Sequence, residues 1–284
     1  MAPPRDPLAV RLCRADDEIA VGSIEDAALA ELSGLATTPS SPGVLWAQQD
    51  SGNASELFAI DPSSGASLGR YPVDAPNVDW EDMATDVDGN VLIADTGDNR
   101  EERANVEIIS VAVPVTPSAT AGVPHVPLPA TLTAYRYPDG AQDVEALFVD
   151  PATGDRYVLT KPFGIDDPSF DSDTIVYRLD PPQGDGVGSA TEVARLDLGF
   201  GVLATAADMA RDGRTLLVRT YGSVLAWDRP DGTSIASMFE HEPCKAPGAG
   251  LAQNEAIAFT DDGEGYLTAS EGEHPMLWLV RAAR

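Results

Sequence analysis

The chain has 284 residues, and 43% of them are apolar, which is enough for a packed core in one large domain or two small ones. Its formal net charge of -28 argues against nucleic acid and anionic membrane surfaces as partners, because both would repel it. No apolar run approaches the roughly 20 residues that a membrane-spanning helix needs. The acids are suited either to binding cations or to forming a solvated acidic surface.

The N-terminal segment MAPPRDPLAV has no apolar core of a signal peptide, so no signal sequence is visible in this chain. The run LAVRLC (Leu8 to Cys13) is apolar and short, and we expect it to be a β-strand. Cys13 and Cys244 are the two cysteines of the chain, which excludes a CxxC metal site. They form either one disulfide or two separate buried thiols.

The chain repeats itself. Five short strings, ELSGLAT, DWEDMAT, DVEALFV, TAADMAR and QNEAIAF, share an apolar pattern. Aligned on that pattern, their equivalent residues are Ser33, Glu81, Glu145, Ala207 and Glu255. Each string is followed by a polar turn and then by further short runs rich in β-branched and aromatic residues, such as NVLIADT and TLLVRTY. These are the marks of short β-strands. The fourth run of the fourth repeat is TSIASMF, and we expect it to be a strand as well.

Four short strands repeated at this spacing predict the blades of a β-propeller. The fifth repeat reaches the C-terminus after three runs, so its fourth strand must come from elsewhere. We expect an all-β, five-bladed propeller that forms a single domain over residues 1–284, with residues 1–30 contributing the closing strand. Leu8 to Cys13 is the expected strand, since closing the ring removes an open sheet edge. Six blades and a β-sandwich are the alternatives.

The first strand of each blade lines the axis of a propeller, so the aligned strings should bring carboxylates together. Asp79 and Asp143 precede Glu81 and Glu145 by two residues and share a face with them. Asp82 and Asp208 are expected at the next position along. Converging carboxylates repel one another unless a proton or a cation neutralises them. The predicted ligands of such a cation are Glu81, Glu145, Glu255, Asp143, Asn254 and Asp208.

An all-oxygen set of this kind favours Ca²⁺, with Mg²⁺ as the alternative. Zinc is less suited, because the three histidines lie outside the repeated strings. For the same reason a Ser-His-Asp triad has little support. The opposite interpretation is that some of these acids only accept hydrogen bonds from the backbone.

The second strands end in another polar series, which includes Lys161 and Arg219. Both follow apolar runs where near-burial is expected, and a buried base normally needs a carboxylate partner. They therefore form salt bridges or hold an anionic part of a substrate. In the same series, DTGDN at Asp95 to Asn99 resembles a calcium loop in its oxygen spacing, but it lacks the EF-hand pattern and equally fits a plain turn.

Several strings together resemble a family of uncharacterised bacterial β-propeller proteins that are often exported. They are LSGLA, QDSG, DWEDMA, DTGDN, VEAL and NEAIAF, and they span roughly residues 31 to 272. The resemblance is more distant to calcium-dependent propeller hydrolases of the phytase-like, gluconolactonase and paraoxonase type. It implies an axial calcium, with Glu81, Glu145 and Glu255 as metal-facing acids, and an extracellular or periplasmic location. The chain departs from the pattern at Ser33 and Ala207, where no acid stands.

Two hypotheses of function follow. The first is a calcium-dependent hydrolase, a monomer that acts on a small ester, lactone or phosphoester, with anionic substrates included. In it, Glu81 or Asp79 is the base, and Lys161 or Arg219 holds the substrate. The second is a binding or scaffold propeller whose axial ion is structural.

Overall fold

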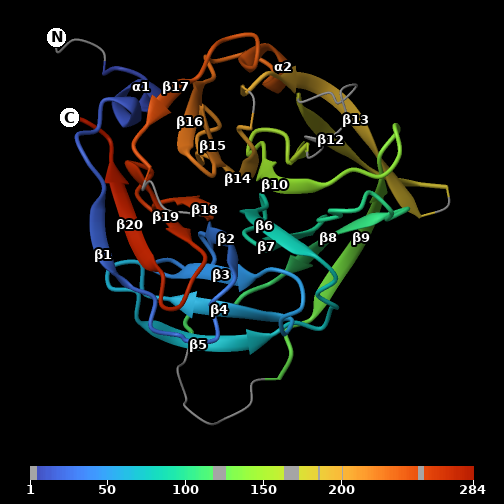
Figure 1. The fold of residues 1–284 in the computed structure, drawn as a ribbon, viewed down its shortest axis with the longest axis horizontal. Coiled ribbons are helices and arrows are strands. Elements are labelled where there is room, and N and C mark those ends of the chain that lie inside the picture. Colours follow the sequence, from blue (N-terminus) through green and yellow to red (C-terminus); the bar gives the residue numbers. More distant parts are fainter. Residues whose placement is uncertain (1–4, 118–125, 163–172, 185, 200, 249–252) are drawn as a thin grey trace.

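The structure, a computed structural model, describes residues 5–117, 126–162, 173–184, 186–199, 201–248 and 253–284. The described chain is almost entirely β-structure, with two short helices, so the all-β prediction is confirmed. Figure 1 shows the sheets arranged radially about a central axis, in the manner of a propeller. The innermost strands, each packed against the next, are β2, β6, β10, β14 and β18.

The sheets follow the order of the chain. The first contains β2 (Leu32–Thr37), β3 (Leu45–Gln49), β4 (Glu56–Ile60) and β5 (Ser67–Pro72). Next along the chain come β6 (Trp80–Thr85), β7 (Val91–Asp95), β8 (Val106–Val111) and β9 (Ala130–Arg136). They are followed by β10 (Val144–Val149), β11 (Arg156–Thr160), β12 (Thr174–Gln183) and β13 (Val187–Leu196). Neighbouring strands within each group of four are antiparallel.

The second and third groups form one eight-stranded sheet. Their outer strands β9 and β13 run parallel and pair at Gly188 with Tyr135 and at Ser189 with Arg136. At this seam a side chain on Gly188 would press against Tyr135 and within 2.6 Å of the Asp180 carbonyl oxygen. Glycine is thus required here for space, and it lets the two outer strands approach each other.

The last two sheets are four-stranded. One contains β14 (Ala204–Met209), β15 (Thr215–Thr220), β16 (Ser223–Asp228) and the short outer strand β17 (Cys244–Ala246). The other contains β18 (Asn254–Phe259), β19 (Gly265–Ser270), β20 (Met276–Arg281) and β1 (Ile19–Ser23). β1 pairs antiparallel with β20, so an N-terminal strand completes the C-terminal sheet.

The segment that completes this sheet is not the predicted one. Residues Leu8–Cys13 form the helix α1, and the prediction of a strand there is wrong. Pro7 immediately precedes the helix, where its fixed φ suits a helix start, and Ala9 and Leu12 are buried three residues apart on one face. α1 packs against β16 and β17, where it covers the edge of the shortest outer strand.

A second predicted strand, in TSIASMF, is also wrong. Its centre forms the short helix α2 (Ile235–Met238). The Ser234 hydroxyl accepts a hydrogen bond from the Ser237 backbone N–H and so caps the helix, while Ile235 and Met238 are buried three residues apart. The outer strand of this sheet comes instead from β17, which lies between α2 and β18 in the chain.

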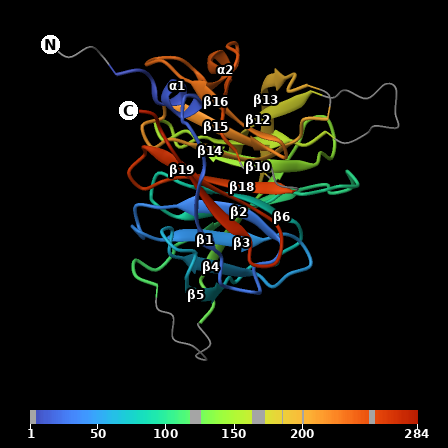
Figure 2. The same ribbon diagram turned by 60° about the vertical axis from the view of Figure 1, so that its left-hand side comes forward.

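The cysteines form a disulfide. Cys13 at the end of α1 is joined to Cys244 at the start of β17, across a separation of 231 residues. The disulfide therefore fastens the N-terminal helix to the edge of the β14–β17 sheet. The chain ends also meet, since the Ala283 backbone N–H donates to the Arg11 carbonyl oxygen at 2.9 Å, and both views show the C-terminus beside α1 (Figures 1 and 2).

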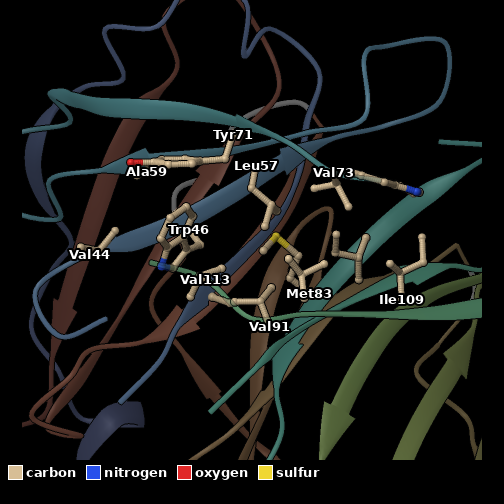
Figure 3. Packing of buried hydrophobic residues seen from close by; sticks show 14 residues of the cluster. Val44, Trp46, Leu57, Ala59, Tyr71, Val73, Met83, Val91, Ile109 and Val113 are labelled. Carbon is tan, nitrogen blue, oxygen red and sulfur yellow. The ribbon is translucent and has the colours of Figure 1, made fainter. Parts of the chain in front are cut away.

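Hydrophobic clusters fill the spaces between successive sheets. In the one between the first two sheets, Trp46 and Tyr71 meet edge to face with ring centroids 5.5 Å apart. Met83 and Ile109 from the neighbouring sheet face them (Figure 3). Burial of such large apolar side chains is the main force that holds neighbouring sheets together. No helix of the described chain has the length and apolar character needed to cross a membrane.

Candidate metal centre at one end of the axis

Every inner strand carries a β-bulge at the same place, one residue after its start. The register shifts between Leu32 and Gly34 in β2, and the other inner strands shift at matching points. The residues placed at these bulges are Ser33, Glu81 with Asp82, Glu145, Thr205 and Glu255. A bulge re-aims side chains and is common beside functional sites. Here it gives the start of each inner strand the same local geometry.

The register corrects the alignment of the fourth repeat. Thr205, and not Ala207, stands at the bulge of β14. The hydroxyl of Thr205 donates to the Asn254 carbonyl oxygen at 2.8 Å and ties β14 to β18. Asp208 consequently lies farther along its strand than Asp82 does, and the two are not equivalent positions. An apolar pattern alone could not reveal this, because a bulge adds a residue without changing which residues are apolar.

Two groups of carboxylates meet at the bulge end of the axis. Glu81, Asp143 and Glu145 each place an oxygen within 4.8 Å of the others, and all three are buried. Asp50, Asp79 and Glu81 form a second such group, in which the two aspartates are only half-buried. Glu81 belongs to both groups. The structure thus brings together three of the predicted ligands, with Asp79, and adds Asp50 from the end of β3.

One oxygen of these groups is buried without a hydrogen-bond partner among the described residues. Asp143 accepts the Asp98 backbone N–H at 2.9 Å with one carboxylate oxygen, while its other oxygen, Oδ2, is buried and has no hydrogen-bond partner. A side chain on Gly97 would fall on Glu81 Oε1 and would come within 2.7 Å of Asp79 Oδ2. The carboxylates of Glu81 and Asp79 can therefore lie this close to the loop only because residue 97 is glycine. Buried, unpaired carboxylate oxygens in a confined space are suited to a hard divalent cation.

Burial and mutual repulsion raise the pKa values of these acids. Desolvation is the largest cause for Glu81, whose pKa is well above its ordinary value, and Glu145 adds to it. Burial raises the pKa of Glu145 to about 8, against the opposing effect of Lys161. The pKa values of Asp79 and Asp143 are raised as well, chiefly by desolvation. A cation among these groups would stabilise their charged forms.

Lys161, which follows β11, supplies one positive charge to the cluster. Its ammonium forms an ion pair with Glu145, so the expected salt bridge is present. Nζ also lies 3.4 Å from the Tyr221 hydroxyl and 5.7 Å from the centre of the Tyr221 ring. Burial alone would lower the pKa of Lys161, but Glu145 raises it above its ordinary value. When all three buried acids are ionised, one lysine leaves two negative charges, which a divalent cation would balance.

Arg219 lies at the same end of its strand, opposite the bulge of β14, but it forms no part of the two carboxylate groups. It pairs with Ala206 in the β14–β15 register, is fully buried, and lies against Gly248, where a Cβ would collide with its guanidinium. Burial lowers its pKa to about 10. The position equivalent to Lys161 is held by Tyr221, two residues later, which the sequence reading missed. Aligning the repeats on the end of their second strand would have found Tyr221, because Lys161 directly follows β11 and Tyr221 directly follows β15, at the turn before Ser223.

Glu255 and Asn254 lie at the edge of the cluster. Glu255 is buried and forms a hydrogen bond with the Tyr221 side chain, while Asn254 Nδ2 donates to the Tyr221 carbonyl oxygen at 2.8 Å. Burial raises the pKa of Glu255 to about 7, and Lys161 opposes the rise. Neither residue belongs to the two groups whose oxygens meet within 4.8 Å.

Asp208, the remaining predicted ligand, faces the other end of the axis and accepts the Phe259 backbone N–H at 2.7 Å. Asp82 is completely buried between the inner strands. Its Oδ2 accepts the backbone N–H groups of Leu147 and Ala207, each at 2.8 Å, and so links β6 to β10 and β14. Accepting hydrogen bonds from backbone N–H groups is the role that the sequence offered for such acids as the alternative to metal binding.

The loop after β7, which contains DTGDN, supports the site from outside. Asp95 is buried and accepts the backbone N–H groups of Val78 and Asp79, each at 3.2 Å. Arg103 pairs with Asp95 at 2.7 Å and donates to the Gly97 carbonyl oxygen at 2.8 Å. Asp95 is thus occupied by its own loop, and the loop holds Gly97 and Asp79 in place.

No family model and no curated protein sequence matches this chain. Among solved structures it is similar to a gluconolactonase from Xanthomonas campestris, with 14% sequence identity and a TM-score of 0.48 over 98% of this chain and 95% of that one.

Proposed function

We propose that the chain is a divalent-cation-binding propeller that uses the cation to hydrolyse a small ester, lactone or phosphoester. The observation that carries the proposal is the buried Oδ2 of Asp143, which has no hydrogen-bond partner among the described residues and lies beside Glu81 and Glu145. Ca²⁺ fits such an all-oxygen set, with Mg²⁺ as the alternative. The residues that would hold it are Glu81, Asp143 and Glu145, with Asp79 and Asp50 beside them.

When bound, a divalent cation would polarise the scissile group and lower the pKa of a water molecule. Asp79 is half-buried, so its carboxylate reaches both the cluster and solvent and is placed to accept the proton of an attacking water. Lys161 orients Glu145 through their ion pair and offers its remaining N–H groups to an anionic part of the substrate.

Cation binding is tested first, by titrating the chelator-treated protein with Ca²⁺ and Mg²⁺ in a calorimeter. We expect one divalent cation per chain. Asp143→Asn should lower the affinity at least about tenfold, because it removes a charged ligand. Asp88→Asn, in an exposed turn, is the matched control and should change nothing. Failure of the wild-type protein to bind either ion would overturn the metal centre.

Catalysis is tested separately, with phosphoesters, lactones and aryl esters assayed with and without the cation. Glu81→Gln should abolish cation-dependent turnover while the fold persists. A protein that binds the cation and hydrolyses none of these substrates would instead support the second candidate, a scaffold with a structural ion. The near-complete burial of the three ligands, with exposed fractions of 5%, 5% and 3%, favours that candidate.

The finer architecture is part of the same proposal. We count five blades within a single domain over residues 1–284, since only two residue pairs join β13 to β9 in the eight-stranded sheet. The five hydrophobic clusters between successive inner strands support this number. The proposed monomer would work in an oxidising, extracellular or periplasmic setting, which the Cys13–Cys244 disulfide supports.

A further inference from the structure

The inner strands end in a pocket at the opposite end of the axis from the carboxylate cluster. The last paired residue of each inner strand lines this pocket, and these five residues occupy equivalent register positions. They are Thr37, Thr85, Val149, Met209 and Phe259. With Pro39, Val87 and Pro151 from the turns above them, they enclose a cavity of about 220 Å³ whose walls are mostly apolar.

The charged groups at this pocket leave it negative. Asp208 lines it from β14 and is only part-buried by its neighbours, so its carboxylate reaches the cavity although one oxygen accepts the Phe259 backbone N–H. Asp86 lies at the rim. Arg211 is also at the rim, but its guanidinium is paired with Asp261 at 2.9 Å. The arginine also acts electrostatically on Asp208, but two aspartates stand against this one arginine among the charged residues that line the pocket.

Asp208 is a carboxylate in a poorly solvated place. Burial raises its pKa to about 7, and the backbone hydrogen bonds from Phe259 and Met209 oppose that rise only in part. A cation inside the cavity would stabilise its charged form. The pocket is poorly suited to a metal ion. It offers one carboxylate among apolar walls, whereas calcium takes six to eight oxygen ligands.

We propose that this pocket binds a small organic cation, a primary ammonium carried on a compact apolar body. The ammonium would pair with Asp208, and the body would fill the space between Val149, Met209 and Phe259. The size fits, since an apolar cavity of about 150 Å³ is known to accept benzene. The inference does not depend on the proposed hydrolase, because it concerns residues at the other end of the axis.

The test is calorimetric titration of the full chain with cyclohexylammonium, with cyclohexanol and cyclohexanecarboxylate as matched neutral and anionic probes. We expect binding of the ammonium, about tenfold weaker binding of the alcohol, and none of the carboxylate, because a hydrogen bond to a charged group is lost with the ammonium. Equal binding of the ammonium and the alcohol, or no binding of the ammonium, would overturn the proposal.

Asp208→Asn keeps an acceptor for the Phe259 N–H but removes the charge, so it should weaken ammonium binding about tenfold and leave cyclohexanol binding unchanged. Asp88→Asn, in the exposed turn next to Asp86, is the control and should bind the ammonium as the wild type does. A circular-dichroism melt of each variant shows that it is folded. Unchanged ammonium affinity in folded Asp208→Asn would also refute the proposal.

Discussion

At the scale of single residues, Lys161 is a cation that the chain supplies to its own carboxylate cluster. Its ion pair with Glu145 offsets part of the repulsion among Glu81, Asp143 and Glu145. A lysine in this place limits how strongly a second cation is attracted, since like charges in a poorly solvated site repel. The charge of Lys161 therefore reduces the positive charge that a bound ion would have to supply to neutralise the cluster.

Lys161→Gln should raise the affinity for Ca²⁺ and lower the stability of the cation-free protein, because Glu145 then loses its buried partner. Calorimetry gives the first effect, and thermal melting in chelator gives the second, with an expected loss of about 3–5 kcal/mol. Lys245→Gln, at an exposed position of β17, is the control. Weaker Ca²⁺ binding in Lys161→Gln would contradict this view of the site.

The raised pKa values predict how stability depends on pH. Glu145, with a folded-state pKa of about 8, binds a proton more tightly when folded than in the unfolded chain, where the value is 4.5. Glu255, at about 7, behaves in the same way. Their contribution is full below pH 4.5 and is lost as the pH rises through 7 and 8.

The cation-free protein should therefore melt at a lower temperature at pH 8 than at pH 5, and saturating Ca²⁺ should reduce the difference. The glutamine variants Glu145→Gln and Glu255→Gln should flatten the dependence. Melting curves followed by circular dichroism across this range give the answer. A melting temperature that rises with pH in chelator would show that other groups dominate.

Sequence alone predicted much of this site at residue level. Glu81, Glu145 and Asp143 were expected to converge, and they do, because alternation along a strand and repetition between strands can be read from the chain. Arg219 and Ala207 were misplaced by two residues. Bulges and strand ends depend on hydrogen bonds between strands, which leave little trace in the apolar pattern.

At the scale of elements, the loop between β7 and β8 supports the carboxylate cluster. It brings Gly97 against the carboxylates and fixes itself through the pair Arg103–Asp95. The sequence showed that the loop carries several side-chain oxygens, but it did not show what they bind. Asp95 accepts backbone N–H groups of Val78 and Asp79, which lie in the connection between β5 and β6.

Gly97→Ala should weaken Ca²⁺ binding at least about tenfold, since its methyl group would displace Glu81 and Asp79. Gly222→Ala is a matched control, because a Cβ there meets nothing within 4 Å and no unusual backbone angle is involved. Metal titration of both variants decides the matter. Unaltered binding in folded Gly97→Ala would show that the carboxylates beside Gly97 do not hold the ion.

The elements that sequence reading misplaced lie on the outside of the molecule. Leu8–Cys13 and the TSIASMF segment are short and apolar, and a short apolar run fits a strand or a helix equally well. The inner strands were easier, since each recurs with its turn and its neighbour. The apolar pattern predicted strands correctly where it recurs in several repeats. It failed for single segments that have no counterpart in the other repeats.

At the scale of the whole molecule, the disulfide joins the first described helix to the outer strand of a distant sheet. Cys13 and Cys244 close a loop of 231 residues, and a cross-link over so long a loop restricts the unfolded chain strongly. Its contribution to the free energy of unfolding is expected to be about 2–5 kcal/mol. The carboxylate cluster is built on other elements, with Glu81 in β6 and Glu145 in β10.

Reduction, or the double variant Cys13→Ser with Cys244→Ser, should therefore lower the melting temperature and leave the affinity for Ca²⁺ unchanged. Thermal melts with and without reductant measure the first, and metal titration of the reduced protein measures the second. Loss of Ca²⁺ affinity on reduction would reveal a coupling between α1 and the inner strands that the packing does not predict.

The pairing of β1 with β20 has a consequence for how the protein is made. Ile19 finds its partner in Leu279, almost at the end of the chain. During synthesis the N-terminal strand leaves the ribosome long before that partner exists, since translation proceeds at about 5–20 residues per second. The last sheet can be completed only after β20 has been synthesised, so a nascent chain with an unpaired β1 is an obligatory stage of biosynthesis.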